Sequence, residues 1–285
     1  MITHPSLSLL QNGLLSDFST PRVMGILNVT PDSFYSASRK ESEEAIANRV
    51  EQIISEGGDF IDIGAYSSRP GAEDIPLKVE MERMRKALSV VRKVAPEAML
   101  SIDTFRSEVA VMSVEEFGAG IINDISAGEL DDRMFDTVAR LGVAYIMMHM
   151  QGTPQTMHQQ AKDVKEEEFI KEIFGYFAIR IQELHERGVK DIILDPGFGF
   201  GKTLEQNYLL IRWLKEFKIF ELPILVGVSR KSMIYKTLEC SPEEALNGTT
   251  SLHTHALMQG ANILRVHDVK EAVECVKLYR KVMNQ

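Results

Sequence analysis

The sequence predicts an α/β protein built as one (β/α)₈ TIM barrel with an N-terminal β-hairpin. Eight short runs of β-branched and aliphatic residues recur along the chain, each followed by a stretch long enough for a helix, and no low-complexity linker interrupts the series. The 285 residues suit one domain spanning 1–285, with residues 1–20 as the hairpin extension. An open doubly wound sheet would give a similar local pattern, so it remains the alternative.

The first expected element is the hairpin. Asn12-Gly13, a strong signal for a two-residue turn, lies between the apolar runs Leu7–Leu10 and Leu14–Phe18. Because this hairpin precedes the first barrel strand, it could close the bottom of the barrel.

The barrel strands follow as nearly continuous apolar runs, which is typical of parallel strands buried on both faces. In order they are expected at Arg22–Thr30, Phe60–Ala65, Met99–Thr104, Ile121–Ser126, Ala144–His149, Asp191–Pro196, Ile224–Ser229 and Ile263–Asp268. Between them lie helical patterns, of which Ser42–Glu56 and Glu166–Arg187 are the clearest, the second ending at Gly188.

The composition excludes several classes of protein. A formal net charge of −9 argues against a general nucleic-acid or anionic-membrane binder, which needs a basic face. Cys240 and Cys275 lack the spacing of a zinc site or a disulfide framework. The first twenty residues contain no Lys or Arg and do not resemble a secretory signal, and no segment approaches a membrane span. We therefore expect a cytoplasmic protein.

Each predicted strand ends in polar side chains, and in a barrel all these ends open onto one face, where the catalytic residues of this architecture lie. Any one of them could simply cap the following helix, but as a set they suggest a site. The carboxylates suit a ligand edge rich in N–H donors, and the cationic residues, with Arg69 and Arg230, suit an anion such as pyrophosphate. The strand-end residues are Asn28, Asp62, Asp103, Asn123, Asp124, His149, Asp195, Ser229, Lys231, Arg265 and His267.

The segment Asp195–Thr203, DPGFGFGKT, is rich in glycine but is not a phosphate-binding P-loop, because Pro196 occupies the position of the first glycine. Its glycines could instead turn the backbone tightly or let it approach a flat ligand. Among the histidines, His149 and His267 at strand ends are the better site candidates, whereas the helical spacing of the others indicates structural roles.

These motifs resemble one family. They are MGILNVTPDSF (24–34), SSRPGA (67–72), SIDT (101–104), INDI (122–125), MHMQGTP (148–154), LDPGFGFGK (194–202), GVSRKSM (227–233) and RVHD (265–268). In this order and with this content they resemble the dihydropteroate synthases, and the match extends from Arg22 to Asp268.

The resemblance implies a (β/α)₈ barrel that condenses 6-hydroxymethyl-7,8-dihydropterin pyrophosphate with p-aminobenzoate in folate biosynthesis. It places Asp103, Asn123 and Asp195 on the pterin, with Lys231 on the pterin carbonyl side, and makes Asp103, Asp195 and Lys231 the catalytic residues. It also implies that Ser68, Arg265 and His267 hold the pyrophosphate, that Phe34 and Pro70 wall the p-aminobenzoate pocket, that Asn28 binds Mg²⁺, and that the protein is a homodimer. Arg69 is expected among the substrate-binding residues as well.

Two loops depart from the family pattern. Tyr66 stands where many members have an acidic residue, and Tyr35–Ser38 replaces a glycine-rich stretch. Both departures concern the loops and p-aminobenzoate recognition rather than the pterin pocket. Two alternatives remain at this point: a pterin-dependent methyltransferase barrel and a non-catalytic pterin-binding homologue.

Overall fold

Eight parallel strands form a nearly closed barrel in the computed structural model, which describes residues 8–11, 14–30, 39–67, 74–154, 156–157 and 164–284. The sheet order is β8-β7-β6-β5-β4-β3-β10-β9, and a parallel bridge between Leu194 and Ile224 joins its two ends. The predicted barrel is confirmed, and the open sheet is wrong. The strands are β3 (Arg22–Asn28), β4 (Phe60–Gly64), β5 (Leu100–Asp103), β6 (Ile121–Asp124), β7 (Ala144–Met148), β8 (Ile192–Asp195), β9 (Leu225–Val226) and β10 (Ile263–Val266).

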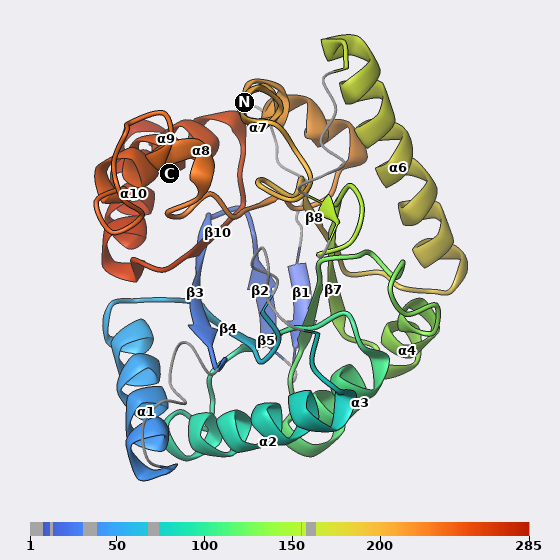
Figure 1. Ribbon diagram of the computed structural model, residues 1–285, viewed down its shortest axis with the longest axis vertical. Helices are drawn as coiled ribbons and strands as arrows, with labels where there is room; N and C mark the ends of the chain where they lie inside the picture. The colour runs from blue at the N-terminus through green and yellow to red at the C-terminus, as the bar shows by residue number, and fades with distance from the viewer. Residues whose placement is uncertain are drawn as a thin grey trace.

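Helices surround this barrel on its outside (Figure 1). Both helices that the sequence predicted most clearly are present, as α1 and α6, and Gly188 takes the expected left-handed conformation after α6 with a φ of 83°. The helices are α1 (Arg39–Ser55), α2 (Leu77–Val94), α3 (Ser107–Phe117), α4 (Met134–Leu141), α6 (Glu166–Glu186), α7 (Leu204–Trp213), the 3₁₀ helix η2 (Leu214–Phe220), α8 (Ser232–Tyr235), α9 (Leu246–Gln259) and α10 (Val269–Val282).

The packing of α1 shows why the helices can lie close to the strands. Ile46, Val50 and Ile53 of α1 are buried against the barrel. A Cβ on Gly25 of β3 would lie 2.7 Å from Cγ2 of Ile53, so only glycine allows this approach. In the described part of the chain, no helix is long and apolar enough to cross a membrane.

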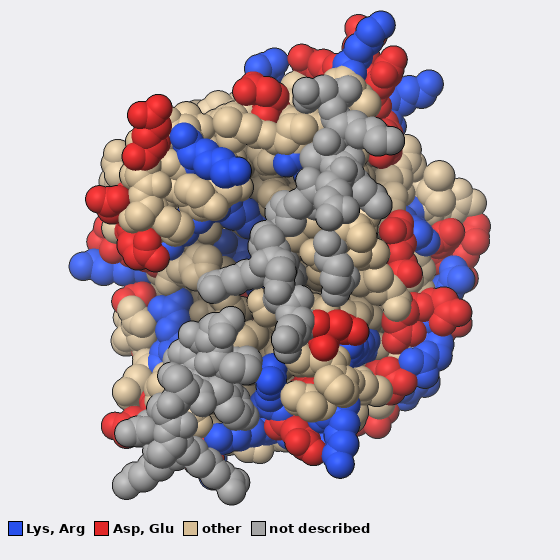
Figure 2. All heavy atoms as spheres, viewed as in Figure 1, with Lys and Arg blue, Asp and Glu red and all other residues tan. Residues whose placement is uncertain are grey.

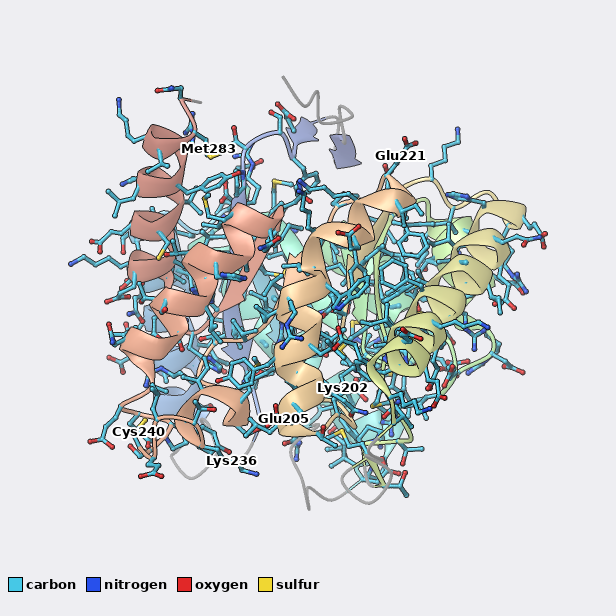
Figure 3. The ribbon with its side chains drawn as sticks, turned by 90° about the horizontal axis from the view of Figure 1, so that it is seen from above. Lys202, Glu205, Glu221, Lys236, Cys240 and Met283 are labelled. Carbon is cyan, nitrogen blue, oxygen red and sulfur yellow. The ribbon has the colours of Figure 1, made fainter. Side chains whose placement is uncertain are left out.

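The bottom of the barrel is closed by the N-terminal segment, as the sequence suggested. β1 (Ser8–Gln11) and β2 (Leu14–Asp17) pair antiparallel and lie at the end opposite Lys202 (Figure 3). Phe18, which follows them, is buried and stacks on Phe60 with ring centroids 6.2 Å apart. Inward-facing side chains of the strands pack in one cluster with these two rings: Met24, Ile121, Ala144, Ile146, Ile193, Leu225 and Ile263.

The upper half of the barrel is polar inside. Side chains alternate along a strand, so every second residue after this apolar layer also points inward. Strand register then brings Asn28 beside Gly64, Gly64 beside Asp103, and Asp103 beside Asn123. The fold therefore collects polar side chains from separate strands at the mouth formed by the carboxyl ends of the strands.

Candidate active site

Asp62 is the hub of the hydrogen-bond network below the barrel mouth. Its side chain is fully buried, and its Oδ1 accepts a hydrogen bond of 2.6 Å from Oγ of Ser101. Its Oδ2 accepts from Nδ2 of Asn123 at 3.2 Å and from Nε of Arg265 at 2.6 Å. Asp62 was predicted only as one of the strand-end residues, without a role of its own. Its inward position between Phe60 and Gly64 was the signal that could have identified it.

Arg265 joins this hub to Asp103. Its Nη2 donates to Oδ2 of Asp103 at 2.6 Å, while its Nε is bound to Asp62. Burial raises the pKa of Asp103 to about 7, opposed by the nearby guanidinium of Arg265. Arg265 thus contacts carboxylates on the predicted pterin side of the site, whereas the family resemblance implied a role on the pyrophosphate alone.

Asp195 and Lys231 form a second pair of charges at the mouth. The backbone N–H of Gly197 donates to Oδ1 of Asp195 at 2.8 Å, and burial raises the pKa of this carboxyl against the opposing effect of Lys231. The ammonium of Lys231 donates to the carbonyl of Phe198 and lies 4.8 Å from the ring centroid of Phe200. Burial lowers the pKa of Lys231 to about 8, opposed by Asp195.

The two pairs belong to one site. Lys231 interacts electrostatically with Asp195, Arg265 and Asp103, and Asn123 reaches the same network through Asp62. The structure therefore brings together five predicted residues from separate strand ends, which are Asp103, Asn123, Asp195, Lys231 and Arg265. Figure 2 shows this face of the molecule, with basic side chains visible in the central hollow and acidic and basic side chains mixed around the rim.

Asn28 lies at the edge of this network. A Cβ on Gly64 would be 3.5 Å from Oδ1 of Asn28 and 3.4 Å from Oδ2 of Asp103. The amide oxygen and the carboxylate therefore flank the space that Gly64 leaves open. Asn28 is in a position to offer an oxygen ligand at the mouth.

His267 lies at the rim beside β10. Its Nδ1 is 3.0 Å from Oγ of Ser229, and its carbonyl accepts a hydrogen bond of 2.6 Å from Nη2 of Arg49. Desolvation by the surrounding protein lowers the pKa of His267 to about 4, and the guanidinium of Arg265 adds to this effect, although the residue is exposed at the rim. At neutral pH its imidazole is therefore uncharged and offers a hydrogen bond rather than a positive charge.

The glycine-rich segment after β8 turns tightly against the segment after β7. A Cβ on Gly197 would lie 1.9 Å from the carbonyl oxygen of His149, and one on Gly201 would lie 2.3 Å from that of Gln151. Nζ of Lys202 donates to the carbonyls of His149, Gly197 and Phe200 at 2.9–3.1 Å. Of the two roles left open for these glycines, the structure supports the tight turn at Gly197 and Gly201.

His149 is not part of the mouth, contrary to its interpretation as a site candidate. Its ring packs against Tyr176 and Phe177 of α6, with centroids 4.9 and 6.4 Å away. Met148 takes the inward position on β7, so the next residue points outward between the barrel and α6.

An apolar cluster that was not predicted from the sequence lies in the described part of the mouth. It consists of Ile125, Met148, Met150 and Met157, with Phe105 and Phe200 packed against them. The ring of Tyr66 meets that of Phe105 edge to face at 5.0 Å. Flat apolar ligands could therefore lie beside the charged network.

Four of the predicted substrate-binding residues lie outside the described residues: Phe34, Ser68, Arg69 and Pro70.

Comparison with known proteins agrees with this geometry. The family model described as pterin binding enzyme matches residues 24–267. The chain is 39% identical to dihydropteroate synthase of Escherichia coli K12 over 282 residues, covering 98% of this chain and 97% of that protein.

Solved structures agree as well. Yersinia pestis dihydropteroate synthase in a sulfonamide drug complex has a TM-score of 0.87 and 37% identity, covering 97% of this chain and 99% of that one. The Xanthomonas albilineans enzyme with 4-aminobenzoic acid has a TM-score of 0.88 and 33% identity, covering 99% and 100%. The chain therefore belongs to the dihydropteroate synthases, transferases of folate synthesis within the pterin-binding enzyme family.

Proposed function

We propose that this chain condenses 6-hydroxymethyl-7,8-dihydropterin pyrophosphate with p-aminobenzoate, giving 7,8-dihydropteroate and pyrophosphate, through the residues at the barrel mouth. The observation that carries the residue roles is the convergence of Asp103, Asn123, Asp195 and Lys231 on one charged network. Each comes from a different strand or from the turn after one, so the complete barrel is needed to assemble them.

Asp195 and Lys231 fit the two sides of a pterin ring. The amino group and N3–H of a pterin form an edge with two parallel donors, which a buried carboxylate such as Asp195 accepts well. Lys231 would donate to the adjacent pterin carbonyl, and Asp103 and Asn123 would bind the remaining polar atoms of the ring. The methionines of the apolar cluster and Phe200 supply the surface on which a flat ring can lie.

In the reaction the amine nitrogen of p-aminobenzoate bonds to the pterin methylene carbon and loses one proton, while the bond from that carbon to the pyrophosphate oxygen breaks. Positive charge develops on the pterin as pyrophosphate departs, and the carboxylates of Asp103 and Asp195 would stabilise it. Arg265 and His267, with Ser68 and Arg69, would hold the departing anion. Because Arg265 already binds Asp62 and Asp103, it would couple the pterin side of the site to the pyrophosphate side.

The oxygen atoms of the side chains at the mouth are suitable ligands for Mg²⁺. This ion prefers oxygen ligands and is usually held by few protein groups together with substrate phosphates and water. Oδ1 of Asn28, across Gly64 from the Asp103 carboxylate, would be its protein ligand. Among the described residues, no group of three His, Cys, Asp or Glu side chains could hold a metal by itself, so the phosphates would complete the site. When bound, Mg²⁺ would neutralise charge on the leaving pyrophosphate.

A homodimer in the cytoplasm is part of this proposal. Met258 of α9 and Leu278 and Val282 of α10 are large apolar side chains with 54%, 69% and 71% exposure. Leu278 and Val282 are four residues apart and share one helix face. These side chains support an interface between two copies on this side of the barrel, which sedimentation of the wild type and a Leu278→Glu/Val282→Glu variant would test.

Pyrophosphate release, measured with and without p-aminobenzoate, tests the function itself. Release that requires p-aminobenzoate, with dihydropteroate formed in equal amount, is the expected result. A non-catalytic pterin-binding protein would bind pterin but release nothing, and a pterin-dependent methyltransferase would not use the pyrophosphate ester. Either outcome would overturn the proposal.

A further inference from the structure

Arg230 directly precedes Lys231 in the turn after β9 and has a left-handed backbone. Its φ is 54°, in a region where any residue with a Cβ is strained. The N–H of Lys231 donates to the carbonyl of Val228 at 3.1 Å and closes the turn. Arg230 therefore occupies the third position of this turn, where glycine or asparagine normally supplies a positive φ. Such a conformation persists only where the surrounding structure holds it.

The protein holds Arg230 by its side chain and by its backbone. Nε and Nη2 donate to the two carboxylate oxygens of Asp268, each at 2.8 Å. Nη1 donates to the carbonyls of Pro242 and Glu243 at 3.0 and 2.6 Å. The backbone N–H donates to Oγ1 of Thr249, which is buried on α9, at 3.0 Å. These contacts come from three separate segments and together compensate the strain of the turn.

The turn is also joined to the end of β10 at two consecutive positions. Oγ of Ser229 lies 3.0 Å from Nδ1 of His267 and accepts a hydrogen bond of 3.2 Å from the backbone N–H of the same residue. Arg230 then pairs with Asp268, the residue after His267. The side chains of this ion pair are only 24% and 19% exposed, so salt screens it less than a surface pair. Both connections fix the turn relative to β10.

The conformation of the turn determines how Lys231 enters the barrel mouth. The ammonium of Lys231 donates to the carbonyl of Phe198 and lies over the ring of Phe200, close enough to Asp195 to interact with its charge. A lysine side chain is flexible and does little to fix its own direction. If Arg230 left the left-handed region, the peptide before Lys231 would rotate and turn the side chain away from these partners.

We infer that Arg230, paired with Asp268, is a positioning residue that holds this turn in its left-handed form and so directs Lys231 at the pterin. This inference rests on the proposed function, in which Lys231 donates to the pterin carbonyl. Arg230 touches no substrate in this role. Its loss weakens pterin binding through Lys231 alone.

The test compares two double variants. Arg230→Met/Asp268→Asn removes both charges together, so the net charge is unchanged and no partly buried charge is left unpaired. Arg85→Met/Glu116→Gln is the matched control, since Arg85 of α2 binds Glu116 of α3 through the same fork of two bonds, of 2.7–2.8 Å, on the exposed surface. The measurement is calorimetric affinity for 6-hydroxymethylpterin.

The Arg230/Asp268 variant should bind 6-hydroxymethylpterin about ten- to a hundredfold more weakly than wild type, the loss expected for one charge-assisted hydrogen bond. The control should stay within about twofold. In a Lys231→Met background the Arg230/Asp268 change should have no more than about a twofold further effect, because both changes remove the same contact. Unchanged affinity of the double variant, or losses that simply add in the Lys231→Met background, would overturn the inference.

The pH profile gives a second signature. Lys231 faces Asp195, Asp103, Arg265 and Lys202, and burial lowers its pKa to about 8. Once Lys231 is displaced, its proton no longer affects pterin binding, so the Arg230/Asp268 variant should lose the decline of affinity through about pH 8 that the control keeps. A variant that binds more weakly by the same factor at every pH would show that Lys231 is still in place, which contradicts the inference.

Two single variants separate the backbone from the ion pair. Arg230→Gly and Arg230→Ala both remove the guanidinium, but glycine adopts a positive φ without strain and alanine does not. Arg230→Gly should therefore bind 6-hydroxymethylpterin at least about fivefold more tightly than Arg230→Ala, the population ratio that the left-handed strain implies. Equal affinities would contradict the role of the turn, even if the double variant failed to fold. A wild type that binds no 6-hydroxymethylpterin would instead refute the proposed function.

Discussion

Arg265 and Asp103 form an ion pair of 2.6 Å across the barrel mouth, and the same guanidinium holds the buried Asp62 at 2.6 Å. One cation thus compensates two carboxylates that come from neighbouring strands. A clamp for pyrophosphate that acted alone would not need these contacts. In the proposed function, Arg265 would therefore position the pterin side of the site as well as offer charge to the leaving group.

Arg265→Ala should consequently weaken binding of 6-hydroxymethylpterin and weaken binding of its pyrophosphate ester still more. The variant should also lose about 3–5 kcal/mol of unfolding free energy, because it leaves the buried carboxylate of Asp62 without its charged partner. Calorimetry with both ligands and urea unfolding measure these effects. Adding Asp62→Asn should restore part of the stability. If only the ester binds less tightly, Arg265 does not position the pterin pocket.

Asp195→Asn should weaken pterin binding by about 1.5–3 kcal/mol, the contribution of one charge-assisted hydrogen bond. An amide can accept from one ring N–H but presents a donor to the other, whereas the carboxylate accepts both. Asp191→Asn is a suitable control, because Asp191 directly precedes the same strand at its opposite end. Wild-type affinity of the Asp195 variant in calorimetric titration would show that this carboxylate does not face the pterin edge.

Pterin affinity should fall as the pH rises through about 8, the lowered pKa of Lys231. Burial favours the neutral amine, so the charged donor is present below that pH and is lost above it. A lysine with an ordinary pKa would keep its charge to about pH 10. The decline should approach tenfold per pH unit if binding needs the proton. Lys231→Met should bind more weakly and lose this part of the pH profile, whereas titration of the pterin itself would persist in both proteins.

The sequence could predict the eight strands because each is a nearly continuous apolar run, and that pattern depends on burial rather than on particular neighbours. The site residues were predicted less completely, because a position at a strand end does not show whether the side chain points into the barrel or out of it. The residues at inward-pointing positions of their strands are Asp103, Asn123, Asp195, Arg265 and His267. His149 follows the inward-pointing Met148 and therefore points outward. Strand ends alone do not separate these two groups.

The partner of Arg265 could not be predicted in this way. Asp62 and Arg265 are 203 positions apart in the chain and meet only because β10 pairs with β3, which pairs with β4. The contact of Tyr66 with Phe105 likewise joins residues that follow two different strands, β4 and β5. Such contacts depend on barrel closure and loop conformation, which no local pattern encodes.

Gly197→Ala should be one of the most disruptive small substitutions at the site. Gly197 has a φ of 74°, and an added Cβ would lie 1.9 Å from the carbonyl oxygen of His149. Gly142, the cap of α4, is the matched control, since its φ is 65° but no described atom lies within 4 Å of the added Cβ. Gly142→Ala should therefore cost only the strain of the left-handed backbone, about 1–2 kcal/mol.

Gly197→Ala carries the same strain plus a clash with backbone that cannot swing away, so its loss should exceed that of the control by at least about 2 kcal/mol in urea unfolding. The clash would also move the amide that donates to Asp195 and the carbonyls that hold Lys202. Pterin affinity should therefore fall in Gly197→Ala and stay at the wild-type level in Gly142→Ala. Equal stability losses with equal pterin affinities would mean that the turn after β8 relaxes freely, and that its packing against the segment after β7 does not hold Asp195 in place.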